Sequence, residues 1–178
     1  MIIEEVLTEA MSVSVKWDGA PAVVCGTNPD NGRFFVGTKS VFAKAAKINY
    51  TKKDIAANHG TDELGQKLLK CLVHLKKLNI QGVVQGDLLF TDEDITRKNV
   101  DGKPNLTFRP NTITYAVPEA SELGKQIDRA KLGIIFHTTY TGDSLASMNA
   151  QGGADVSSFA KSNDVFFDNA TYKDVSGS

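Results

Sequence analysis

Hydrophobic and polar positions follow two different periods along this chain, and each period predicts one kind of element. Apolar residues that alternate with polar ones, or that form short continuous runs, are typical of β-strands. They predict strands over residues 13–17, 22–26, 33–39, 83–90, 105–109, 112–117 and 131–140. Apolar residues spaced three and four positions apart predict helices over about 61–78 and about 119–130.

The first of these helices carries the clearest apolar stripe. Asp62 and Glu63 stand at its start, and Lys76 and Lys77 stand at its end, as the helix dipole favours. Its expected buried face consists of Leu64, Leu68, Cys71, Leu72, Leu75 and Leu78. We therefore expect this helix to be part of the scaffold.

Three segments have weaker patterns. Residues 1–10 indicate a short acidic amphipathic helix, residues 41–60 a lysine-rich loop or short helices, and residues 141–178 no assignable element. Strands outnumber helices in this pattern. The chain is therefore expected to form one α+β domain, residues 1–178, around a twisted and mainly antiparallel sheet with packed helices.

The overall charge of the chain is balanced. A net charge of −1 and a pI near 6.3 give no global basic surface for nucleic acid, so any such binding must come from a local patch. The one local basic stretch contains Lys44, Lys47, Lys52 and Lys53. Contact with phosphates is one interpretation of this stretch, and a solvated polar loop is the other.

Several features indicate where the protein works. The sequence contains no apolar run of about 18 residues for a membrane span and no signal peptide. Its two cysteines, Cys25 and Cys71, show neither metal-ligand spacing nor a disulfide framework, so buried thiols are expected. We expect a soluble protein without a membrane partner in a reducing cytoplasm, including that of a virus-infected host cell.

The most informative motif is the run Lys16-Trp17-Asp18-Gly19, which ends an alternating segment. Alternation places Ser14, Lys16 and Asp18 on one face before the chain turns at Gly19. An amine attacks phosphorus only when it is neutral, so Lys16 would need a pKa lowered by burial, by a metal or by a second cation such as Lys39. The alternative is a solvated strand lysine with Asp18 as its surface partner.

This K-x-D-G run, followed by two predicted strands of which the second delivers Lys39, resembles the adenylation domain of the covalent nucleotidyltransferases. That superfamily comprises ATP-dependent DNA ligases, RNA ligases and mRNA capping enzymes. The resemblance implies that Lys16 attacks the α-phosphate of ATP in the presence of Mg²⁺ and forms a lysine–AMP adduct. It further implies that the adduct is passed to a 5′-phosphate at a nicked DNA or RNA end, with Ser14, Asp18, Gly19 and Lys39 contacting the nucleotide.

Two further segments extend the resemblance. Gly86-Asp87-Leu88 is similar to the third family motif, with aspartate in place of the usual glutamate, and Asp87 would then meet the ribose or a metal ion. Tyr115, in the strand predicted over 112–117, would lay its ring against the nucleotide base. The alternatives are a strand that ends at a turn for Asp87 and an ordinary core residue for Tyr115.

The fourth and fifth family motifs are only partly present. Residues 131–137 keep Gly133 and the apolar centre of the fourth motif, but Leu132 replaces glutamate and His137 replaces lysine. On an alternating strand, His137 would face the same cleft as Lys16. The fifth motif and an arginine after K-x-D-G are missing, which predicts either a domain that is incomplete at its C-terminus or a diverged site.

These departures leave other functions open. A non-catalytic nucleotide- or nucleic-acid-binding module, descended from the same fold, would bind ATP without forming an adduct. A structural protein with a chance K-x-D-G would do neither.

Overall fold

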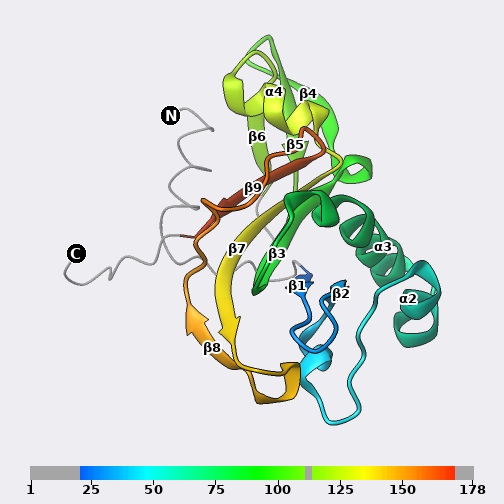
Figure 1. The fold of residues 1–178 in the computed structure, drawn as a ribbon. Helices are drawn as coiled ribbons and strands as arrows, with labels where there is room; N and C mark the ends of the chain where they lie inside the picture. The colour runs from blue at the N-terminus through cyan, green and yellow to red at the C-terminus, as the bar shows by residue number, and fades with distance from the viewer. Residues whose placement is uncertain (1–20, 111–113, 171–178) are drawn as a thin grey trace.

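The computed structural model describes residues 21–110 and 114–170 (Figure 1). The K-x-D-G motif, including Ser14, Lys16, Asp18 and Gly19, lies outside the described residues, as do the helix predicted over 1–10 and the strand predicted over 13–17.

The described residues form a larger and a smaller β-sheet with helices between the strands in sequence. The strands of the larger sheet are β1 (Ala22–Thr27), β2 (Phe34–Gly37), β3 (Val83–Thr91), β7 (Leu132–Thr141), β8 (Asn149–Gly152) and β9 (Val165–Asn169). The strands of the smaller sheet are β4 (Thr96–Val100), β5 (Lys103–Phe108) and β6 (Tyr115–Pro118). The helices are α2 (Lys52–His59), α3 (Glu63–Leu75) and α4 (Glu122–Arg129), with 3₁₀ turns η1 (Lys39–Phe42), η2 (Lys76–Leu78), η3 (Asp92–Asp94) and η4 (Leu145–Ser147).

Strand β7 pairs with three other strands of the larger sheet. The sheet order is β2-β1-β3-β7, and β3 pairs with β7 along nearly its whole length. The other edge of β7 is shared, because β8 pairs antiparallel with its second half and β9 pairs parallel with its first half. All strand pairs except β7–β9 are antiparallel, which confirms the predicted α+β class with a mainly antiparallel sheet.

The β3–β7 ladder contains two irregularities. Gln85 pairs with Thr138 and Gly86 pairs with Phe136, so His137 is an extra residue in β7. Such a bulge changes the direction of the side chains around it. A second shift, between Leu88 and Phe90, follows further along β3.

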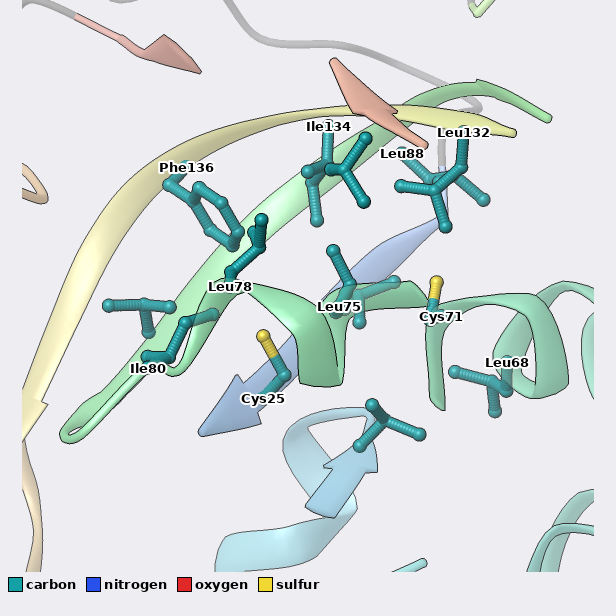
Figure 2. Packing of buried hydrophobic residues seen from close by; sticks show 14 of the residues in the cluster. Cys25, Leu68, Cys71, Leu75, Leu78, Ile80, Leu88, Leu132, Ile134 and Phe136 are labelled. Carbon is teal, nitrogen blue, oxygen red and sulfur yellow. The ribbon is translucent and has the colours of Figure 1, made fainter. Parts of the chain in front are cut away.

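Helix α3 covers one face of the larger sheet, as the apolar stripe predicts. Leu68, Cys71 and Leu75 are buried there, and Figure 2 shows them directed toward strand residues that include Ile134 and Phe136. The predicted burial of Leu64 is wrong, because this residue is 41% exposed.

Gly65 is buried where the stripe predicts Leu64. A Cβ atom at Gly65 would lie 2.1 Å from the carbonyl oxygen of Gly60, so α2 and α3 approach each other too closely there for a larger side chain.

The smaller sheet builds a second core with α4. Leu106, Phe108, Val117 and Ile127 are buried in it, together with Ile135 from β7. Its first two strands, β4 and β5, are joined by a tight turn. Asp101 and Gly102 both have positive φ angles, 52° and 79°, as a tight hairpin turn requires.

Several predicted boundaries differ from the structure, and two of these differences have a visible cause. The strand predicted over 33–39 ends at Gly37, because the Thr38 hydroxyl accepts a hydrogen bond from the Ser40 N–H and starts η1 at Lys39. The helix predicted over 119–130 begins only at Glu122, after the Ser121 hydroxyl accepts from the Gly124 N–H. In both cases a capping side chain sets the boundary.

The short helix α2 confirms the prediction of short helices within residues 41–60. Thr51 and Asp54 form a reciprocal capping box at its start. Within the two described ranges, no helix is long and apolar enough to cross a membrane.

Replacement of Gly86 by alanine should destabilise the β3–β7 pair. A Cβ atom at Gly86 would lie 2.6 Å from the Ile135 carbonyl oxygen, so one strand must move. We expect Gly86→Ala to lower the free energy of unfolding by about 1–3 kcal/mol in urea denaturation. The matched control is Gly152→Ala, since a Cβ atom there meets nothing within 4 Å. Equal effects of the two substitutions would contradict the close approach.

The two cysteines should be unreactive in the folded protein. Burial raises the pKa of the Cys71 thiol to about 12, and burial raises that of Cys25 above its usual range. Because the thiolate is the reactive form, a disulfide reagent at about pH 8 should modify neither thiol in the native protein. Both should react in concentrated guanidinium chloride. Rapid modification of the native protein would show that the core around α3 opens readily.

Candidate functional site

The structure brings together two of the residues that the sequence singled out, Asp87 on β3 and His137 on β7. The Nε2 atom of His137 lies 3.3 Å from Oδ1 of Asp87, although the residues are 50 positions apart in the chain. Their side chains are 20% and 15% exposed, so the pair is accessible from solvent but partly enclosed. An ionised carboxylate only accepts hydrogen bonds, so Nε2–H donates to it.

The bulge in β7 fixes the position of His137. Its Nδ1 atom lies 2.7 Å from the hydroxyl of the next residue, Thr138, so both ring nitrogens have partners. The backbone at this point is also held, because the His137 carbonyl accepts a hydrogen bond of 2.7 Å from the Gly153 N–H. The adjacent Phe136 carbonyl accepts one of 2.8 Å from the Ala170 N–H. The imidazole is therefore oriented before any ligand binds.

A second polar pair lies on the same strands. The Tyr140 hydroxyl donates a hydrogen bond of 2.5 Å to Oε1 of Gln85, and burial raises the pKa of this hydroxyl. Gln85 and Asp87 alternate along β3 with Val84 and Leu88, which belong to the core beneath α3. The polar pairs therefore lie on the sheet face opposite α3.

The first described residues of the chain run directly beside Asp87. Ala22 pairs with Asp87 across the β1–β3 ladder, and the Pro21 carbonyl accepts a hydrogen bond of 2.9 Å from the Leu88 N–H. The chain thus emerges from its first 20 residues at the Asp87 end of the sheet.

Lys39 lies just after the end of β2, at the start of η1. Gly37 pairs with Val24 in an antiparallel ladder, so the end of β2 lies beside the beginning of β1. Lys39 follows Gly37 by two residues and is exposed in η1. Gly37 is level with Gln85 across β1. Beyond it, η1 leaves the sheet, with the Phe42 ring packed 4.3 Å from that of Tyr140.

Tyr115 lies elsewhere. It is only 4% exposed, and its ring stacks on Phe108 with the centroids 5.8 Å apart inside the second core. This position agrees with the alternative interpretation, an ordinary core tyrosine.

The partial fourth motif has a structural explanation in this fold. Leu132 is fully buried in the core beneath α3, where an unpaired glutamate would carry a large desolvation cost. Gly133 lies against the ring of Phe90, since a Cβ atom there would be 2.3 Å from Cε2. Ile135 pairs with Asp87 on the same sheet face but is buried, and His137, the last position of the motif, is the motif's one polar residue and contacts Asp87.

Sequence reasoning missed three polar residues of this face: Thr138, Gln85 and Tyr140. One signal was present, because residues 137–139 are three successive polar positions in an otherwise apolar strand.

Asp87 offers one carboxylate to a metal ion at this site. Among residues 21–110 and 114–170, no group of three or more His, Cys, Asp or Glu side chains gathers to hold a metal ion. Mg²⁺ is commonly bound by one or two carboxylates, with phosphate and water oxygens completing its shell. The single carboxylate of Asp87 fits that arrangement together with a nucleotide.

The comparisons with known proteins give a family but no activity. A family model described as "Family of unknown function (DUF6267)" matches residues 2–178. No curated protein and no solved structure matches the chain.

Proposed function

We propose that this chain, which belongs to DUF6267, a family of unknown function, is a nucleotidyltransferase that forms a lysine–AMP intermediate from ATP. The lysine–AMP intermediate would then be used to join DNA or RNA ends. One observation carries the proposal. The residues matched to the third and fourth family motifs, Asp87 and His137, lie on adjacent strands and touch.

This contact is separate support for the proposal, because the motif matches in the sequence do not by themselves place Asp87 beside His137. Two chance matches 50 residues apart have no reason to meet on one face of a sheet. Lys39, which the resemblance assigns to the phosphates, is exposed just after β2 of the same sheet.

Covalent geometry is consistent with Lys16 acting at this face. Lys16 precedes Pro21 by five residues, and a chain spans at most about 3.6 Å per residue. Five residues of chain could therefore span up to about 18 Å from Pro21, whose carbonyl accepts a hydrogen bond from the residue after Asp87. A lysine side chain then adds several ångströms of reach.

The proposed reaction is an in-line displacement. Nζ of neutral Lys16 forms a bond to the α-phosphorus of ATP, the bond from that phosphorus to the pyrophosphate oxygen breaks, and the amine loses a proton to solvent. Asp87 accepts a hydrogen bond from the ribose or binds the metal ion, and Asp18 orients the sugar. His137 and Lys39 provide positive charge beside the phosphates. Mg²⁺, when bound, offsets phosphate charge.

A second function, a non-catalytic nucleotide-binding module, is favoured by one observation. Leu132 stands where the fourth motif has glutamate, and it is buried in the core. This position therefore offers no carboxylate to a nucleotide. Such a module would show a nucleotide-dependent rise in melting temperature without an adduct.

Replacement of Lys16 by alanine should abolish covalent labelling. We expect the protein to acquire label from ATP labelled at its α-phosphate in the presence of Mg²⁺, because Lys16 is the proposed nucleophile. Lys16→Ala should lose the label, as shown by denaturing gel and intact mass. The control is Lys98→Ala, an exposed lysine on β4. A label that persists in Lys16→Ala contradicts the proposal, and a folded wild-type chain that is stabilised by ATP but never labelled supports the non-catalytic module.

Substitutions of His137 should show whether adduct formation depends on its positive charge or on the shape of its ring. If His137 acts as the cation that lysine provides in the fourth motif, His137→Lys should retain labelling within about tenfold, whereas His137→Gln should slow it by on the order of 10²–10³-fold. The measurement is the single-turnover rate of adduct formation at saturating ATP. Equal losses in both variants would show that the imidazole is needed for position and not for charge.

A further inference from the structure

The largest concentration of like charge in the described chain follows β2. Residues 39–53 contain five lysines and no acidic residue, in a chain whose net charge is −1. We call this set the lysine surface: Lys39, Lys44, Lys47, Lys52 and Lys53. All five residues are exposed. The segment is the cyan loop that leads from the blue strands to α2 in Figure 1.

Hydrogen bonds fix the backbone of this segment to β2. The Lys47 N–H donates a hydrogen bond of 3.1 Å to the Ser40 carbonyl and closes the loop between them. Asn49 and Val36 exchange backbone hydrogen bonds of 3.0 and 3.2 Å, and the fully buried Asn49 side chain donates a third, of 3.0 Å, to the Val36 carbonyl. The first three lysines are thus presented from one closed loop at the outer edge of β2.

The lysines of this surface lack the ion pairs that other lysines form. No carboxylate within the described ranges lies within ion-pair distance of any of the five. By contrast, Lys67, Lys70 and Lys77 pair with Glu63, Asp92 and Asp164 respectively. The positive charge of the lysine surface is therefore not balanced within the described fold.

Helix stability does not explain the placement of Lys52 and Lys53. They occupy the first turn of α2, where the helix dipole disfavours positive charge. The one acid nearby, Asp54, serves the helix cap, because its carboxylate accepts the backbone N–H groups of Tyr50 and Thr51. The hydrogen bond from Tyr50 is the main cause that lowers the pKa of Asp54.

We propose that the lysine surface binds the sugar–phosphate backbone of a nucleic acid. Unpaired, flexible lysines suit a regular array of phosphates, which they contact as point charges without reading the bases. The surface begins at Lys39, the residue that the resemblance assigns to the phosphates of the nucleotide. We choose a nucleic acid over other polyanions because this inference rests on the proposed function, the joining of DNA or RNA ends.

The test measures binding of a fluorescent duplex of about 20 base pairs, in DNA and RNA forms, to the full chain without ATP or Mg²⁺. The variant carries Lys44→Gln, Lys47→Gln, Lys52→Gln and Lys53→Gln, and leaves Lys39 unchanged because of its place in the nucleotide site. The control carries the same charge change at four other exposed lysines: Lys76→Gln, Lys98→Gln, Lys103→Gln and Lys161→Gln.

We expect the variant, and not the control, to lose affinity by about tenfold or more at low salt. The slope of log affinity against log salt should become shallower by about 0.9 for each phosphate contact removed. Equal losses in variant and control, an unchanged slope, or binding to phosphatidylserine vesicles in place of the duplex would each overturn the proposal.

Labelling from ATP is measured on the same proteins. Label retained in the variant while duplex binding falls supports the lysine surface as separate from the nucleotide site. Duplex binding that depends on the four lysines, in a chain that never labels, supports this surface while the proposed chemistry fails.

Discussion

The antiparallel pairing of β3 with β7 is the constraint on which the rest of the structure depends. It joins two strands about 40 residues apart, supplies the sheet face that α3 covers, and brings Asp87 to His137. Gly86 permits the backbones to approach, and the bulge at His137 turns an imidazole toward the polar face. A regular ladder with larger side chains would give a similar core but would remove this meeting of acid and imidazole.

The two faces of the larger sheet differ in the side chains that they carry. Beneath α3, the sheet is packed with apolar side chains that leave little freedom of arrangement, which accounts for the buried Leu132 at a motif position. On the other face, the Asp87–His137 and Gln85–Tyr140 pairs satisfy one another with hydrogen bonds. Buried or partly buried polar groups that are paired in this way hold a defined geometry. The core thus supports a preorganised Asp87–His137 pair, while the Gln85–Tyr140 pair is buried among apolar residues such as Val24 and Val83.

Much of the fold was predictable from the sequence, because β1, β3, β7 and α3 have strong apolar periodicity. Leu64 was mispredicted because periodicity does not register the close approach of Gly60 to Gly65. The strand β8 was missed because all four of its residues are exposed, and β9 because its pairing with β7 is long-range. For the site, motif likeness identified Asp87 and His137, but their contact depends on a one-residue register shift that no local pattern specifies. Lys16 and Asp18 stay predictions.

The shared edge of β7 has a consequence for how the protein is made. On a ribosome, β1, β3 and β7 emerge before β8 and β9, so β7 is synthesised with one edge still unpaired. The two hydrogen bonds that fix the backbone at Phe136 and His137 come from Gly153 and Ala170, near the end of the described chain. The polar face therefore acquires its final shape late in synthesis, and until then the open edge of β7 is free to pair with the wrong strand.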